Sequence, residues 1–266
     1  MKKHSGKYYA FGTIRQTFTL IELLVVIAII GILAIEKNLK VLGFSDHGPF
    51  YDNRYGLRMD YCDLKEHIEL LKHLREKYKE KIQIKIGLEI EYDPRENDFY
   101  KKLYDEYNLD YLVLGQHFFM SRNGKMKNIY EIENTLDFID YANSIVSAMD
   151  SGFFKIVAHP DIFFVNDFLW DENCEKACDI IINGALERDF LLEFNANGLR
   201  RGMSMFKNGK GYAYPNAKFF EKLSKTNVKV VINSDCHEPK QLFDSYMDLA
   251  HKMCKDLKLN VIEKIF

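Results

Sequence analysis

Hydrophobic and polar residues alternate in two ways along the chain after residue 40. Short apolar runs typical of buried strands are separated by segments whose apolar residues recur every three or four positions, as on a helix face. In residues 63–81, for example, Leu64, Ile68 and Leu71 recur between charged residues. The predicted strands are 40–47, 82–92, 110–118, 154–161, 190–198 and 228–237. The predicted helices are 63–81, 97–108, 132–152, 172–188, 216–227 and 240–257. Gly152 is a suitable C-cap for the third helix.

This alternation of strands and helices, with short connections, predicts parallel strands and an α/β domain. Six predicted strands are slightly too few for a closed eight-fold barrel. The 266 residues, 47% hydrophobic and 29% charged, suit a globular protein with one large or two small domains. The net charge of −2, with both signs interspersed, gives no nucleic-acid-binding pattern.

The five cysteines are scattered, which disfavours a disulfide framework and favours a reducing compartment. Cys174 and Cys178 are four residues apart on a predicted helix, but no second pair completes a zinc site. We therefore expect both to be ordinary core or surface thiols.

The N-terminal residues follow a different pattern. A basic leader precedes the apolar run "FTLIELLVVIAIIGILAI", residues 18–35, which contains one carboxylate, Glu22. A helix of this length just spans the hydrocarbon core of a bilayer, so membrane insertion through residues 18–35 is one expectation. A buried core helix is the alternative, because the part without charge, residues 23–35, is shorter. The predicted division is a leader and hydrophobic helix over 1–36, followed by a domain over 37–266.

This apolar run resembles the N-terminus of type IV prepilins and their secretion-system relatives over about residues 15–35. In that family a basic leader is cut before a Phe, and a Glu at the fifth mature position pairs with a neighbouring subunit. The resemblance makes Phe18 the first mature residue and Glu22 the fifth. Thr17 stands where the family usually has Gly.

Polar residues recur at the carboxyl ends of the predicted strands. The motifs are "SDH" (45–47), "GLEIE" (87–91), "GQH" (115–117), "AHPD" (158–161), "EFNANG" (193–198) and "NSDCH" (233–237). This edge is where parallel α/β sheets build their sites. Imidazoles and carboxylates together suit zinc, manganese or iron, and a site with several ions can activate water for phosphoryl transfer. The pattern therefore predicts a metal-dependent hydrolase. The other histidines, His4, His67, His73 and His251, are expected to be structural, with His67 and His73 solvated.

The motifs "GFSDHGPF", "GLEIEY", "LGQHF", "AHPD", "EFNANGLRRG" and "NSDCHEP" occur in the order seen in PHP-domain phosphoesterases. The resemblance covers about residues 38–260 and is greatest to the histidinol-phosphatase branch. It implies a distorted seven-stranded β/α barrel, a trinuclear metal centre and hydrolysis of phosphate monoesters such as L-histidinol phosphate. The implied metal ligands are His47, Glu89, His117, His159, Asp235 and His237.

The resemblance also implies roles for individual metal ligands and for residues near them. Glu89 would bridge two ions, and Glu89, Asp235 and His237 would be catalytic. Arg200 resembles the substrate-phosphate arginine of the family, with Arg201 as the second candidate. Asn195 and Tyr214 are expected to line the pocket of a small phosphorylated substrate.

The family's His-x-His motif, expected near residues 5–15, is absent from the chain. The prepilin-like run occupies the place of the first strand, so we expect a barrel lacking that strand and fewer than three divalent ions. Phosphatase activity would be reduced. The alternatives are a membrane-anchored, pilin-like or secretion-associated protein with a non-catalytic head, and a metal-binding pseudoenzyme. A catalytic domain of this kind is expected in the cytoplasm, whereas a working prepilin segment would anchor it in the inner membrane.

Overall fold

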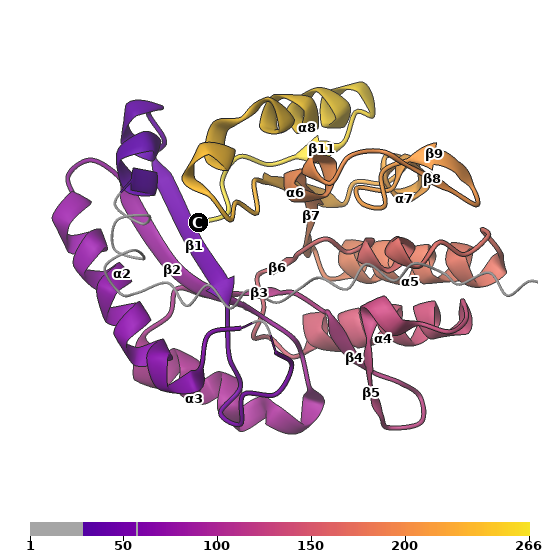
Figure 1. Ribbon diagram of the computed structural model, residues 1–266, viewed down its shortest axis with the longest axis horizontal. Helices are drawn as coiled ribbons and strands as arrows, with labels where there is room; N and C mark the ends of the chain where they lie inside the picture. The colour runs from indigo at the N-terminus through magenta and orange to yellow at the C-terminus, as the bar shows by residue number, and fades with distance from the viewer. Residues whose placement is uncertain (1–28, 57) are drawn as a thin grey trace, which may run out of the picture.

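Seven parallel strands form one sheet whose order follows the chain, in a computed structural model that describes residues 29–56 and 58–266. The strands are β1 (Val41–His47), β2 (Gln83–Ile90), β3 (Tyr111–Leu114), β6 (Ile156–Val157), β7 (Leu191–Asn195), β10 (Lys229–Asn233) and β11 (Asn260–Val261). The sheet curls, and the helices lie on its outer side (Figure 1). The fold is therefore the predicted α/β class, an open β/α half-barrel.

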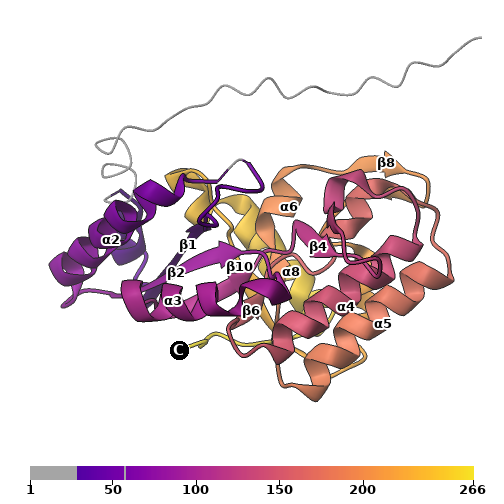
Figure 2. The same cartoon turned by 90° about the horizontal axis from the view of Figure 1, so that it is seen from below.

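Seven α-helices follow residue 58. They are α2 (Leu64–Tyr78), α3 (Asn97–Tyr107), α4 (Leu136–Asp150), α5 (Glu172–Glu187), α6 (Ala196–Arg200), α7 (Ala217–Leu223) and α8 (Ser245–Asp256). Helices α4 and α5 lie side by side (Figure 2). The carboxylate of Asp171 caps α5 by accepting from two backbone N–H groups, a common N-cap arrangement. Gly152 has φ of 77° just after α4, so its predicted role in ending this helix is confirmed.

The predicted elements correspond to observed ones, but the strands are shorter than the apolar runs suggest. The predicted strand 110–118 ends at Leu114, and its last residue begins an antiparallel hairpin of β4 (Phe118–Met120) and β5 (Met126–Asn128). Only two residues of 154–161 pair in the sheet, because the chain then turns at His159. The segment 190–198 leaves the sheet at Asn195, whose side chain caps α6.

Two further features were not predicted. The hairpin of β8 (Ser204–Phe206) and β9 (Gly209–Gly211) carries little apolar periodicity, and β11 is a two-residue strand. Strands this short give no alternation to detect in the sequence. With β11 the sheet has seven strands instead of the six expected.

The concave side of the sheet has its own small core. Buried side chains of four strands and the residue after β6 form it, namely Tyr111, Val113, Ile156, Ala158, Leu191 and Val231. Ile262 and Ile265, from the segment after β11, pack against this cluster. The ring centroid of Phe266 lies 4.9 Å from that of Tyr111. Residues 262–266, which we call the C-terminal segment, thus lie against the concave side of the half-barrel (Figure 1).

The described end of the N-terminal apolar run belongs to the domain core. Residues 29–36 are helical, and Ile30 and Ala34 are buried in the main hydrophobic cluster. Within residues 29–56 and 58–266, no helix has the length and apolar character needed to cross a bilayer. The prepilin-like residues Phe18 and Glu22 lie outside the described part, so that resemblance gains no structural support. The division after residue 36 stays a prediction.

His67 is not solvated as expected but buried, with 5% of its surface exposed. It lies on the same face of α2 as Leu64, Ile68 and Leu71, which are buried too. Its Nε2 is 3.2 Å from Asp46 Oδ2, so a polar partner on β1 accompanies its burial. His73 is exposed, as expected, and His251 is exposed too. Cys174 and Cys178 are buried core thiols, as predicted.

Candidate metal-dependent active site

Three predicted histidine ligands surround a fourth predicted ligand, a carboxylate, at the carboxyl ends of the strands. His47 ends β1 directly opposite Glu89 of β2, while His117 and His159 follow β3 and β6. Glu89 Oε1 lies 3.7 Å from His47 Nδ1, 3.9 Å from His117 Nε2 and 3.2 Å from His159 Nε2. Three imidazoles from three different elements therefore converge on Glu89.

Glu89 is 7% exposed, and its position depends on a glycine of the next strand end. A Cβ at Gly115 would overlap the Glu89 carboxylate, so only glycine leaves room for it there. Burial alone would raise the pKa of Glu89, but the nearby imidazoles of His47, His159 and His117 lower it well below its usual range. Glu89 is therefore anionic at neutral pH.

His159 is held tightly but keeps one ring nitrogen without a partner. Its backbone N–H donates to Glu193 Oε2 at 2.7 Å, and its φ is 30°, in the left-handed region. A non-glycine residue in that region costs about 1–3 kcal/mol and is typical of functional sites. Its Nδ1 is buried without a hydrogen-bond partner. Burial lowers the pKa of His159, but Glu89 and Glu193 outweigh this effect and raise it to about 9.

Asp235 and His237 lie on the loop after β10, beside this cluster. Asp235 Oδ2 accepts from Asn195 Nδ2 at 3.0 Å and from Asn197 Nδ2 at 3.2 Å, and its φ of 45° is also left-handed. His237 is exposed, and its ring centroid is 6.2 Å from that of His47. The structure thus brings all six predicted ligands to one edge of the sheet.

The two candidate phosphate arginines differ in what their guanidinium groups contact. Arg200 donates to Asp244, Ser234 and the backbone oxygen of Gln241, so its donors are used within the protein. Arg201 is exposed, and its guanidinium carbon lies 5.4 Å from the ring centroid of Tyr214. The expected preference for Arg200 therefore has no support from its contacts, whereas the guanidinium group of Arg201 has no hydrogen bond or ion pair within residues 29–56 and 58–266.

The predicted pocket residues Asn195 and Tyr214 are both buried beside the cluster. Asn195 Nδ2 bonds Glu193 Oε2 at 2.8 Å as well as Asp235. Tyr214 is 2% exposed, and its ring centroid is 6.0 Å from that of His159. Both therefore lie behind the proposed ligands, where they shape the site and support His159 and Asp235.

Two residues near the cluster were missed in the sequence. Arg58 forms an ion pair with Glu91 and has Nη2 3.4 Å from His117 Nδ1. The ring of Tyr130 lies 6.3 Å from that of His117. Neither residue ends a strand of the main sheet, so the strand-end pattern could not find them.

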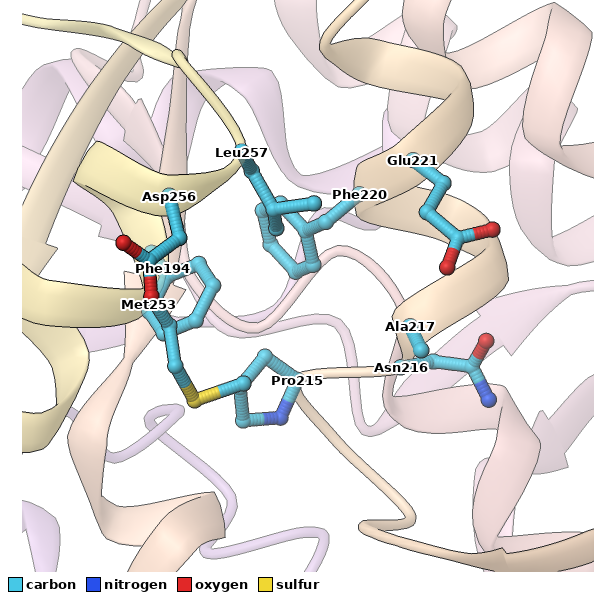
Figure 3. A pocket seen from close by; sticks show the side chains of 9 residues that line it. All are labelled: Phe194, Pro215, Asn216, Ala217, Phe220, Glu221, Met253, Asp256 and Leu257. Carbon is cyan, nitrogen blue, oxygen red and sulfur yellow. The ribbon is translucent and has the colours of Figure 1, made fainter.

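A hollow lies away from the histidines, between α7 and α8 (Figure 3). Its lining is mostly apolar, and Figure 3 shows Met253 directed toward Pro215. Apart from Phe194, which lies one residue from Glu193 and Asn195, its lining comes from other parts of the chain than the strand-end motifs. This hollow therefore contains none of the six predicted ligands.

The donor set suits a divalent metal ion. One ligand atom each from His47, Glu89 and His117 lie within 4.8 Å of one another. Zinc binds imidazole nitrogen and carboxylate oxygen at about 2.0–2.2 Å, so its ligand atoms lie a few ångströms apart. His159 adds a further imidazole, whose Nε2 lies 3.2 Å from Glu89 Oε1. The residues present therefore fit a metal ion.

The profile of the PHP domain matches residues 30–197. The chain belongs to the PHP domain family. The match begins inside the N-terminal apolar run, in agreement with the burial of Ile30 and Ala34. It includes the PHP motifs of β1, β2, β3, β6 and β7.

Several known proteins resemble this PHP chain over most of its length. A protein named "Probable histidinol-phosphatase" from Deinococcus radiodurans is 23% identical over 230 residues, covering 83% of each chain. One of the same name from Schizosaccharomyces pombe is 24% identical over 261 residues, covering 87% of this chain and 82% of that one. A crystal structure of histidinol phosphate phosphatase from Lactococcus lactis, complexed with zinc, L-histidinol and phosphate, has a TM-score of 0.63 at 16% identity and 88% coverage of both chains. This last likeness confirms the fold.

Proposed function

We propose that this protein is a metal-dependent phosphomonoesterase of the histidinol-phosphatase type, which converts L-histidinol phosphate and water into L-histidinol and phosphate. The observation that carries the proposal is the convergence of His47, His117 and His159 on Glu89. The names of the relatives from Deinococcus radiodurans and Schizosaccharomyces pombe support the substrate.

The metal would be held by the six predicted ligands, with Glu89 shared between ions. A bound divalent ion lowers the pKa of a coordinated water and neutralises charge on phosphoryl oxygens. Zinc, manganese and iron all suit these donors. No His-x-His sequence occurs in the chain, so we expect fewer than three ions and a rate below that of a relative with the full motif.

The residues around these ligands have distinct proposed roles. Arg201 binds the phosphate of the substrate through its free guanidinium group, which is suited to bidentate contact. Asp235, held by two asparagine amides, accepts a proton from the attacking water as the new phosphorus–oxygen bond forms. His237 would act in catalysis by holding metal through Nε2, because its Nδ1 lies 3.1 Å from the Asp235 backbone oxygen. A water molecule protonates the leaving alcohol oxygen as the old bond breaks, and the proton taken up by Asp235 passes to solvent.

Phosphate release from L-histidinol phosphate by the full-length chain, loaded separately with zinc, manganese or iron, tests the proposal. The full chain is needed because Ile30 and Ala34 belong to the core. We expect turnover that is lost in Glu89→Ala and shows a raised KM in Arg201→Ala. Metal analysis should give fewer than three ions per chain.

Other results would separate the alternatives. Bound metal without hydrolysis in any metal form would identify a pseudoenzyme. Hydrolysis that persists in Glu89→Ala would show that the reaction does not use this cluster. Three ions per chain with full turnover would overturn the expected loss of activity.

A further inference from the structure

We propose that Arg58 and Glu91 act together as a positioning pair that holds the imidazole of His117 ready to bind metal. This inference rests on the proposed metal-dependent function but assigns residues outside the predicted ligand set. Glu91 has a fully buried side chain, and that of Arg58 is only 9% exposed. Burying two oppositely charged side chains beside one proposed ligand costs desolvation free energy. We therefore expect the pair to have a function.

The contacts among the three side chains are specific. Glu91 Oε1 lies 3.2 Å from His117 Nδ1 and also contacts Arg58 Nη2. Arg58 Nε lies 3.3 Å from the other oxygen, Oε2. The guanidinium group of Arg58 therefore contacts both oxygens of the Glu91 carboxylate, and Oε1 also contacts the imidazole of His117.

This geometry decides which nitrogen of His117 carries the proton. The Glu91 carboxylate can only accept, so Nδ1 is the donor toward it. Arg58 Nη2, 3.4 Å from Nδ1, is also a donor and thus forms no hydrogen bond with a protonated Nδ1. The lone pair is then on Nε2, the nitrogen that faces Glu89. A carboxylate behind a histidine ligand fixes its tautomer and orientation in just this way.

Arg58 has two opposite effects on metal binding, and the sign of the net effect is measurable. As a cation close to the cluster it repels a metal ion. As the partner of Glu91 it keeps the carboxylate in place against His117. If positioning dominates, removing Arg58 weakens metal binding, whereas a simple charge effect would strengthen it.

The test is the zinc affinity of the full-length protein, measured by competition with a chromophoric chelator. We expect Glu91→Gln to weaken zinc binding about tenfold or more, the range found for partners of metal-bound histidines. Arg58→Ala should weaken it in the same direction. The double variant should bind about as Glu91→Gln alone, because Arg58 acts through Glu91. Nitrogen NMR of the histidine rings should show the Nδ1–H form of His117 in the wild type and its loss in Glu91→Gln.

Arg54→Ala is the matched control. Arg54 belongs to the same loop but pairs with three other carboxylates, those of Asp52, Asp93 and Glu96, so its loss should leave zinc affinity unchanged. If Arg58→Ala does not fold, Arg58→Lys keeps the charge without the fork, and weaker binding is again expected. Zinc affinity that is unchanged in Glu91→Gln, or unchanged or higher in the Arg58 variant, would overturn the proposal. Absence of phosphatase activity in the wild type would overturn the proposed function alone, because zinc affinity is read without turnover.

Discussion

Arg200 Nε donates to Asp244 Oδ2 at 2.7 Å, and its Nη2 donates to Asp244 Oδ1 at 3.1 Å. This two-point contact joins the end of α6 to the start of α8, across the loop that carries Asp235 and His237. The same guanidinium also contacts the backbone oxygens of Ser234 and Gln241. Arg200 therefore holds this loop in place through its contacts with Ser234, Gln241 and Asp244.

Replacing Arg200 by Ala should lower the free energy of unfolding by about 2–4 kcal/mol, because several charge-assisted bonds and their partners are lost together. Arg201→Ala, at an exposed position, should change it by about 0.5 kcal/mol or less. Urea unfolding of both variants measures the difference. Equal losses in the two would contradict the structural role of Arg200.

The lowered pKa of Asp244 should make the stability of the protein depend on pH. Burial would raise its pKa, but the bonds from Arg200 and from the backbone of α8 lower it below its ordinary value of about 3.9. A depressed carboxyl pKa contributes stability above the unfolded value, and the contribution is lost as pH falls through the folded value. Asp244→Asn, which can still cap α8, should be less stable by about 1–2 kcal/mol at pH 7. The gap should shrink toward zero as pH falls through the lowered folded pKa of Asp244, and a gap that stays constant with pH would exclude this cause.

Glu89 should dominate metal binding, because three imidazoles surround its carboxylate. We expect Glu89→Gln to weaken zinc binding by about a hundredfold or more, beyond the effect of losing an outer partner. Glu69→Gln, an exposed carboxylate on α2, is the control and should bind normally. Calorimetric titration of both variants with zinc gives the comparison, and similar affinities would count against a Glu89-centred site.

The C-terminal segment should contribute to stability out of proportion to its length. Ile265→Ala removes a partly buried side chain from the concave cluster and should cost about 1–2 kcal/mol. Lys264→Ala, at an exposed neighbour, should cost little. Thermal unfolding at fixed pH measures both, and a cost at Lys264 equal to that at Ile265 would mean that the cluster does not depend on this segment.

The sequence was most informative where chemistry and periodicity coincided. Strand ends such as "SDH" and "GQH" predicted both the sheet and the residues that meet at its edge. Long-range partners were not predictable in this way. Arg58 contacts Glu91, which is 33 positions away in the sequence, and lies near His117, which is 59 positions away. No local sequence pattern indicates these contacts. His67 was misassigned because a lone imidazole on a charged helix gives no sign of its partner on β1, Asp46.

The two arginines show the same limit at closer range. Arg200 and Arg201 are adjacent in "NGLRRG", and family resemblance favours the first. Only their contacts distinguish the two: Arg200 pairs with Asp244, whereas the exposed Arg201 lies over the ring of Tyr214. The motif predicts that an arginine is present at the site but not which of the two faces the substrate.

The placement of residues 262–266 also affects the order of events at the ribosome. Strands β1 to β10 can emerge and pair in the order of their synthesis, since neighbours in the sheet are neighbours in the chain. Their concave faces, however, meet Ile262 and Ile265 only after these residues have left the exit tunnel. Until then the nascent half-barrel presents an uncovered apolar hollow, the kind of surface that chaperones bind. Completion of this domain therefore waits for residues 262–266 to emerge, however early its first strands pair.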